Sequence, residues 1–72
     1  MTLEPGIYEH FKGHRYEVIG VGAHSETEEP HVFYRALYGD YGFWVRPIAM
    51  FVETVERDGY VGPRFFRVAC LG

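Results

Sequence analysis

The sequence predicts a mostly β protein: a small SH3-like or similar curled-sheet barrel of about five short strands with one short helical turn. Aromatic residues make up 18 % of the chain. Turn signals that contain glycine or proline divide it at short intervals, and the segments between them are rich in aromatic and β-branched residues. Short runs of this composition at this spacing are typical of small barrels and curled sheets.

Length and composition favour one folded domain over residues 1–72. A chain of 72 residues has no room for a second core, and one core of this size supplies only ~3–5 kcal/mol of net stability. Hydrophobic residues make up 47 % and the net charge is only -3, which is the opposite of the balance in disordered chains. Because the total charge is mildly acidic, nucleic-acid binding would require a local basic patch.

The first strand is expected over Ile7–Lys12, and Gly13 then turns the chain. Strand alternation places Tyr8, His10 and Lys12 on one face. One face of an edge strand in a small barrel meets water, and we expect these polar residues to lie there. The alternative is that the imidazole, the ammonium group and the phenol together bind an anion or move a proton.

The second strand is expected to run from Arg15 to about His24. Alternation puts Val18 and Val21 on opposite faces, so the apolar face switches within the strand. Gly20 and Gly22 lie where the switch occurs. Glycine at such a place indicates a bulge or a bend in the sheet.

The third strand is expected over His31–Tyr38 and the fourth over Phe43–Arg46, joined by a hairpin that contains glycine. Proline has no N–H to donate to a ladder, so we expect a short helical turn, Pro47–Phe51, to begin at that residue. Residues 52–56 either extend this turn or form another strand, and the last strand is expected over Arg64–Leu71. One face of the third strand is expected to carry Val32, Tyr34, Ala36 and Tyr38.

Cysteine usage and the N-terminal residues indicate the compartment. Cys70 is the only cysteine, which excludes a disulfide within the chain, and its apolar neighbours favour an inert, packed thiol. The first residues lack the basic start and apolar stretch of a signal peptide, and no apolar run is long enough to span a membrane. We therefore expect a cytoplasmic protein with no membrane partner.

Several unusual strings occur in a fixed order along nearly the whole chain, from residue 5 to about residue 68. They are Pro5–Gly13, Tyr16–Val18, Ala23–Glu29, Tyr34–Asp40 and Trp44–Pro47, followed by Met50, Phe51 and Glu53. With these strings the sequence resembles a family of small bacterial proteins catalogued as a domain of unknown function. The resemblance implies a compact, β-rich bacterial protein, and it implies no activity.

Cationic and aromatic residues gather in the strongest of these strings, and they suggest a binding module for an anionic ligand such as a nucleotide or a short oligonucleotide. In this hypothesis two arginines clamp charge and an aromatic ring stacks, in a groove between the sheet and the polar loop that starts at His24. The alternative for these residues is core packing and weak surface ion pairs. The candidate ligand-binding residues are His10, Lys12, His24, Glu26, Tyr34, Arg35, Trp44 and Arg46.

Two other function classes stay open at this point. A small enzyme would use His24 with Glu26 as an acid–base pair, although Ser25 beside them equally indicates local turn hydrogen bonds. A protein-interaction or oligomerisation module would use an apolar patch, formed from Phe33, Leu37, Phe43 or Phe65. No cofactor is expected, and no metal site either, because the four histidines show no zinc-binding spacing and paired cysteines are missing.

Overall fold

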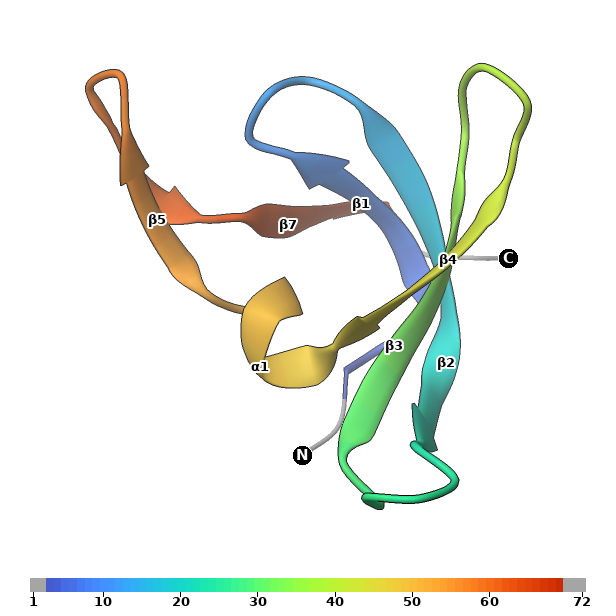
Figure 1. The fold of residues 1–72 in the computed structure, drawn as a ribbon. Coiled ribbons are helices and arrows are strands. Elements are labelled where there is room, and N and C mark those ends of the chain that lie inside the picture. Colours follow the sequence, from blue (N-terminus) through green and yellow to red (C-terminus); the bar gives the residue numbers. More distant parts are fainter. Residues whose placement is uncertain (1–2, 70–72) are drawn as a thin grey trace.

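The computed structural model describes residues 3–69, so Cys70 and the end of the expected last strand lie outside the described residues. Within this range the chain forms seven strands and one short helix (Figure 1). In chain order these are β1 (Gly6–His10), β2 (Arg15–Ala23), β3 (Pro30–Ala36), β4 (Phe43–Pro47), α1 (Ile48–Phe51), β5 (Thr54–Arg57), β6 (Tyr60–Pro63) and β7 (Phe65–Ala69).

The strands form two antiparallel sheets, one of five strands in the order β4-β3-β2-β1-β7 and one of two strands, β5-β6. The predicted mostly β class with one helical turn is confirmed. The expected barrel is corrected, because the larger sheet is open, with β4 and β7 at its edges. The chain between these two edge strands is used for the helix and for the separate β5–β6 hairpin. That hairpin turns tightly through Asp58 (φ 52°) and Gly59 (φ 84°).

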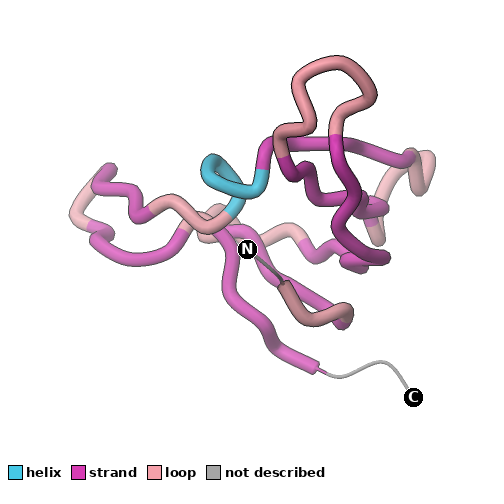
Figure 2. Tube along the Cα trace, turned by 90° about the horizontal axis from the view of Figure 1, so that it is seen from below, coloured by secondary structure: helices cyan, strands magenta, loops and turns pink. Residues whose placement is uncertain are grey.

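One face of the larger sheet, called the inner face below, carries the hydrophobic core. Helix α1 packs on this face between the larger sheet and the β5–β6 hairpin (Figure 2), and contributes Ile48 and Phe51, which are 2 % and 1 % exposed. The remaining members come from four strands of the larger sheet. The core cluster consists of Tyr8, Val18, Val32, Tyr34, Ile48, Phe51 and Phe65. Three of these seven side chains are phenylalanine or tyrosine rings that contact the ring of Phe51.

The face of β1 that carries Tyr8 is buried, whereas the sequence predicted that it would face water. Tyr8, expected to face water, is buried among the core rings, and its hydroxyl donates a hydrogen bond of 2.8 Å to the Glu4 carbonyl. Alternation correctly groups Tyr8 with His10, but it does not say which side of a strand the core covers. The phenol can be buried because its one polar group finds a backbone acceptor.

The predicted bulge in β2 is present. The register shifts between Val18, opposite Tyr34, and Gly20, opposite Phe33, which leaves Ile19 as the extra residue. Ile19 is 46 % exposed. Because the extra residue reverses the alternation, Val21 returns to the inner face and packs against the core.

The turn after β4 begins one residue later than expected. Pro47 is the last residue of β4 and precedes the helix as its N-cap, and the helix itself spans Ile48–Phe51. The segment left open as turn or strand forms β5. Within residues 3–69 no helix has the length and apolar character needed to cross a bilayer.

Candidate functional site

Two parts of the predicted site, the polar loop and Trp44, lie toward opposite ends of β3. The loop of His24 and Glu26 joins β2 to β3, while Trp44 lies just after the β3–β4 connection at the opposite end (Figure 1). The hollow beside Trp44 is lined by residues 36–44 and by none of the His24 loop, so Trp44 and this loop belong to separate surfaces.

Trp44 borders a hollow of about 250 Å³ beside the β3–β4 connection. Its side chain is 56 % exposed, although it lies on the inner face, directly opposite the buried Tyr34. The ring is exposed because β4 is an edge strand with no neighbour beyond it. The residues that line the hollow are Ala36, Tyr38, Gly39, Asp40, Gly42 and Trp44.

Arg46 follows Trp44 at the next inward position of β4, since it pairs with the buried Val32. Its Nε donates a hydrogen bond of 3.3 Å to the Tyr34 hydroxyl, and its guanidinium lies 5.9 Å from the centre of the Phe65 ring. No carboxylate of the described residues lies within ion-pair distance of it. Arg46 thus presents positive charge that its own chain does not neutralise within this range.

Tyr34 has a different role from the predicted one. It is 5 % exposed and makes edge-to-face contacts with Tyr16, Phe51 and Phe65. A ring packed in this way cannot stack on a ligand. Its hydroxyl instead orients Arg46.

Tyr16 and His14, which no sequence pattern placed at this end of the sheet, both contact Tyr38 there. The hydroxyls of Tyr16 and Tyr38 are 2.9 Å apart, and the His14 ring stacks on Tyr38 with centres 4.1 Å apart. Burial, followed by the hydrogen bond with Tyr38, raises the pKa of Tyr16 far above its ordinary value. Tyr16 is therefore a neutral hydroxyl at physiological pH, and it fixes a partly exposed aromatic ring at the border of the hollow.

His10 lies on the same inner face, further from the hollow. Its ring makes an edge contact with Phe65, with centres 4.9 Å apart, and its Nδ1 accepts a hydrogen bond from the Lys12 backbone N–H. Burial, followed by the positive charges of Arg64 and Arg46, lowers the pKa of His10 below its ordinary 6.5. Although the chain as a whole is acidic, this part of the inner face is cationic.

The lowered pKa of His10 gives a prediction for stability. Between the two pKa values the unfolded chain binds a proton at this site and the folded chain does not, so unfolding becomes more favourable there. The free energy of unfolding should be highest above about pH 6.5 and fall as the pH drops through the folded-state pKa. We expect His10→Gln to flatten this fall, measured by urea unfolding at several pH values, whereas His24→Gln should leave it in place. An unchanged slope in His10→Gln would contradict the assignment.

Arg35 does not share a face with Trp44 and Arg46. It pairs with Phe43 on the other side of the sheet, where its Nη2 lies 2.9 Å from the Glu17 carboxylate. It also lies 6.0 Å from the Phe43 ring centre. The predicted clamp of two arginines is therefore not assembled, and Arg35 has the surface ion pair that was its alternative role.

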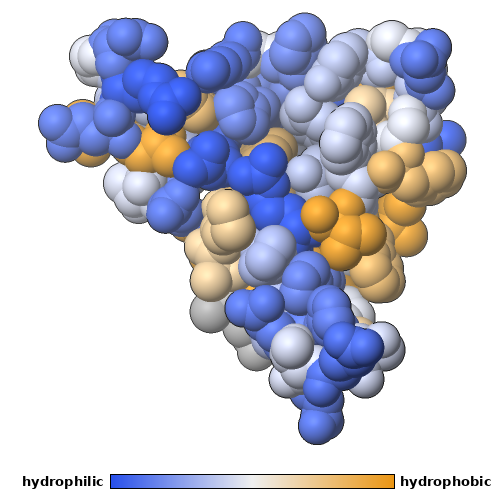
Figure 3. All heavy atoms as spheres, viewed as in Figure 1, coloured by the Kyte–Doolittle hydropathy of each residue, from blue (hydrophilic) through white to orange (hydrophobic). Residues whose placement is uncertain are grey.

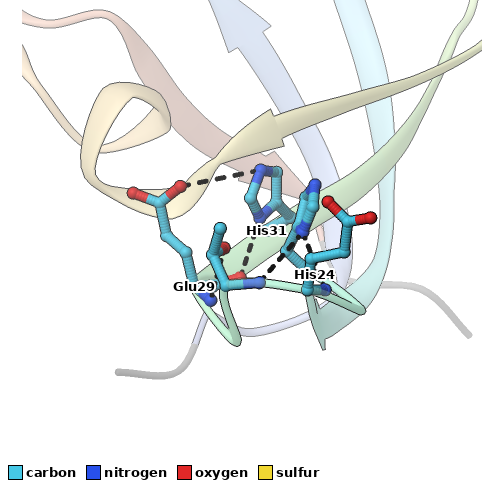
Figure 4. A network of polar contacts seen from close by, with 5 residues as sticks. His24, Glu29 and His31 are labelled. Atoms are coloured by element: carbon cyan, nitrogen blue, oxygen red, sulfur yellow. Dashed lines mark hydrogen bonds and ion pairs between the residues drawn. The ribbon is translucent and has the colours of Figure 1, made fainter.

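The loop of His24 has the structure of a tight polar turn (Figure 4). His24 Nδ1 accepts hydrogen bonds from the backbone N–H groups of Glu26 (3.1 Å) and Thr27 (3.3 Å). It is the main chain of Glu26, not its carboxylate, that meets the imidazole. The carboxylate that approaches an imidazole here belongs to Glu29, 3.9 Å from His31 Nε2. These contacts match the turn alternative and give no support to an acid–base pair of His24 and Glu26.

No group of three or more histidine, cysteine, aspartate or glutamate side chains suited to holding a metal ion occurs within residues 3–69. Lys12 is exposed, and its ammonium lies 5.9 Å from the centre of the neighbouring Phe11 ring. What the inner face offers a ligand is therefore aromatic surface, hydroxyls and cations.

The fold defines a small all-β protein built on an open five-stranded antiparallel sheet with a short helix on its inner face. The chain belongs to the family described as "Protein of unknown function (DUF1653)", whose model matches residues 6–67. A crystal structure of a protein of this family from Bordetella bronchiseptica is 33 % identical to the chain, with a TM-score of 0.87. The match covers 97 % of this chain and 92 % of that one. No functionally curated protein matches the sequence. The resemblance drawn from the sequence strings is thereby confirmed.

Proposed function

We propose that this protein is a binding module for a small anionic ligand that carries a planar ring, such as a nucleotide or the end of a short single-stranded oligonucleotide. One observation carries the proposal: Trp44, more than half exposed at the border of a hollow, shares the inner face with Arg46, which has no carboxylate partner among residues 3–69. An aromatic platform beside a free cation is the arrangement that binds nucleotides on small β sheets.

The spacing of the two side chains suits this ligand class. Residues two apart on a strand are separated by about 7 Å, a distance that a nucleoside monophosphate spans between its base and its phosphate. The Tyr34 hydroxyl holds the Arg46 Nε, which leaves the terminal nitrogens of the guanidinium for bidentate bonds to an anion. The positive charges of Arg64 and Arg46 both reach this side of the sheet, as their lowering of the His10 pKa indicates.

The setting proposed for this activity is the bacterial cytoplasm, where nucleotides are abundant. The relative from Bordetella bronchiseptica supports the bacterial part of this expectation. The acidic net charge of the chain favours short or single ligands over long polyanions. Long duplex nucleic acid is therefore the less favoured ligand.

The single tryptophan of the chain is a natural probe for the proposal. Stacking of a base on Trp44 should quench its fluorescence, so we would titrate the protein with AMP, GMP, UMP and an oligothymidylate at low salt. We expect saturable quenching that weakens as salt increases. A Kd of about 1 mM corresponds to only ~4 kcal/mol of binding free energy. If neither quenching nor NMR shift changes occur at this ligand concentration, the proposal is overturned.

Charge removal tests the role of the arginine. Arg46→Gln should weaken binding about tenfold or more, because a charge-assisted hydrogen bond is worth ~1.5–3 kcal/mol. Arg46→Lys should recover part of this loss, since it retains the charge but not the fork of donors. Arg57→Gln on β5 is the matched control: it changes the net charge equally, on the separate hairpin. Equal losses in the two glutamine variants would show general electrostatics in place of a site.

A further inference from the structure

The hollow beside Trp44 has a floor of small residues. Ala36, at the end of β3, lies opposite Gly42, just before β4, and its N–H donates to the Gly42 carbonyl at 3.0 Å. A Cβ at Gly42 would meet no atom of the described residues within 4 Å apart from its chain neighbours, so the space there is open. The volume of about 250 Å³ lies below the ~300–1,000 Å³ of sites that enclose drug-sized ligands. The hollow therefore suits one planar base better than a whole nucleotide.

Two aromatic side chains border this floor, and one of them is held in place by its neighbours. Trp44 follows Gly42 by two residues and so lies on the same face of the sheet. Tyr38 also lines the hollow, and its ring is stacked on His14 while its hydroxyl lies 2.9 Å from that of Tyr16. A ring that is already fixed loses little conformational freedom when a ligand binds. Part of the wall that a base would contact is therefore preformed.

Among the described residues that line the hollow, Asp40 alone carries a charge. It is exposed, and no cation of residues 3–69 lies within ion-pair distance of its carboxylate. Figure 3 shows pale and hydrophilic residues together at the β3–β4 connection, at the upper right of the view. An ionised carboxylate only accepts hydrogen bonds, and two parallel N–H donors satisfy both of its oxygens. The hollow thus combines aromatic surface with a strong acceptor.

We propose that the base bound in this hollow is guanine, and that Asp40 recognises it. The Watson–Crick edge of guanine carries two adjacent donors, the ring N1–H and the exocyclic amino group, which match the two oxygens of a carboxylate. Adenine and cytosine place an amino group beside an unprotonated ring nitrogen, whose lone pair a carboxylate repels. Uracil places its one N–H between two carbonyls. This inference rests on the proposed nucleotide-binding function and adds the identity of the base.

The same carboxylate determines which way the nucleotide lies. Asp40 repels a phosphate group, whereas Arg46, beyond Trp44 along β4, attracts one. The base therefore occupies the hollow, with its Watson–Crick edge toward Asp40, and the phosphate lies toward Arg46. An acidic residue at one end of the site and a basic residue at the other match a ligand with donors at one end and an anion at the other.

Fluorescence titrations of Trp44 with GMP, IMP and AMP test the choice of base. The three ligands share the same ribose and phosphate, so their Kd values differ only through the base. We expect GMP to bind about tenfold more tightly than AMP, and IMP, which has the N1–H but lacks the amino group, to lie between them. Equal Kd values for GMP and AMP would overturn the guanine inference and leave the proposed function in place. If none of the three ligands binds, both are overturned.

Asp40→Asn should change the preference between bases. An asparagine side chain offers a donor beside an acceptor, the pattern that pairs with adenine, so the preference for GMP should be lost or reversed. Asp58→Asn is the matched control, because Asp58 is also exposed in a hairpin turn, and asparagine tolerates its φ of 52°. Both variants remove one negative charge, but only Asp40→Asn should alter the ratio of the GMP and AMP Kd values. An unchanged ratio in folded Asp40→Asn would contradict the role of this residue.

Gly42→Val tests whether the base lies on the floor of the hollow. The new side chain has room and the φ of Gly42 is not positive, so the variant should fold and fill the space. It should lose the quenching by GMP, IMP and AMP alike. Gly20→Val on β2 is the control, since a Cβ at Gly20 is equally unobstructed and its φ is not positive either. GMP binding by folded Gly42→Val at the affinity of the unmodified chain would place the base elsewhere and overturn the inference.

Discussion

Replacing Phe51 by alanine should leave about half of the protein or more unfolded at room temperature. Phe51 is 1 % exposed, and its ring stacks on Phe65 with centres 4.1 Å apart and planes within 2°. It also makes edge-to-face contacts with Tyr8 and Tyr34, with ring centres 5.7 and 5.4 Å away. Loss of a buried phenylalanine costs about 3–5 kcal/mol. A single core of this size supplies about the same amount of net stability, so the substitution consumes nearly all of it.

Circular dichroism with urea unfolding at 25 °C would measure this loss. Met50→Ala is the matched control, because Met50 lies on the same helix and is 48 % exposed. Its free energy of unfolding should change by less than about 0.5 kcal/mol. A folded Phe51→Ala variant with a cooperative transition near that of the parent would show that α1 is not needed to close the core.

Local sequence patterns were sufficient for the parts of the fold that depend on one strand. Alternation grouped Val32, Tyr34, Ala36 and Tyr38 on one face of the third strand. The first three are buried, whereas Tyr38 lies beyond the end of β3 and is 39 % exposed. The glycine at position 20 indicated the bulge in β2, because only an extra residue keeps both valines of that strand on the core side. Patterns of this kind depend on the chain's own period and need no knowledge of its neighbours.

Two other features depended on contacts between segments far apart in the sequence: that the larger sheet stays open, and which face of β1 is buried. Tyr8 looked like a solvent-facing residue because it alternates with Ile7, yet helix α1, some forty residues later in the sequence, covers its side of the strand. The strand count also rose because β5 and β6 pair with each other and not with the larger sheet. The residues of β1 give no indication of either the packing of α1 on this strand or the pairing of β5 with β6.

In the candidate site, too, relations within one strand could be predicted from the sequence, whereas relations between strands could not. Trp44 and Arg46 share a face because they are two apart on one strand, and this relation could be read from the sequence. Whether Arg35 joined them depended on the register between β3 and β4, which the length and shape of the hairpin set. The register places Tyr34 opposite Trp44, so Arg35 points to the other face. The contribution of Tyr16 required the pairing of β2 with β3, which its own strand does not reveal.

Gly6→Ala tests the junction between β1 and the edge strand β7, and its effect should be second only to that of the core substitution. Gly6 has a φ of +153°. A Cβ at this position would lie 2.7 Å from the Ala69 carbonyl oxygen and 2.9 Å from Arg67 Nε. The arginine can move, but the carbonyl belongs to the strand that pairs with β1. Overpacking costs about 1–3 kcal/mol, and the unfavourable φ adds to it.

Because the close contact is with backbone, we expect relief through loss of β7 pairing rather than through a small side-chain shift. Amide hydrogen exchange in Gly6→Ala should therefore accelerate first at the amides of residues 66–69, while those in β3 retain most of their protection. Gly20→Ala is the matched control, since nothing lies within 4 Å of a Cβ there and its φ is not positive. Uniform acceleration in both variants would indicate that β7 unfolds with the whole sheet. Local acceleration confined to Gly6→Ala would show that the close approach at Gly6 is what keeps this edge strand in register.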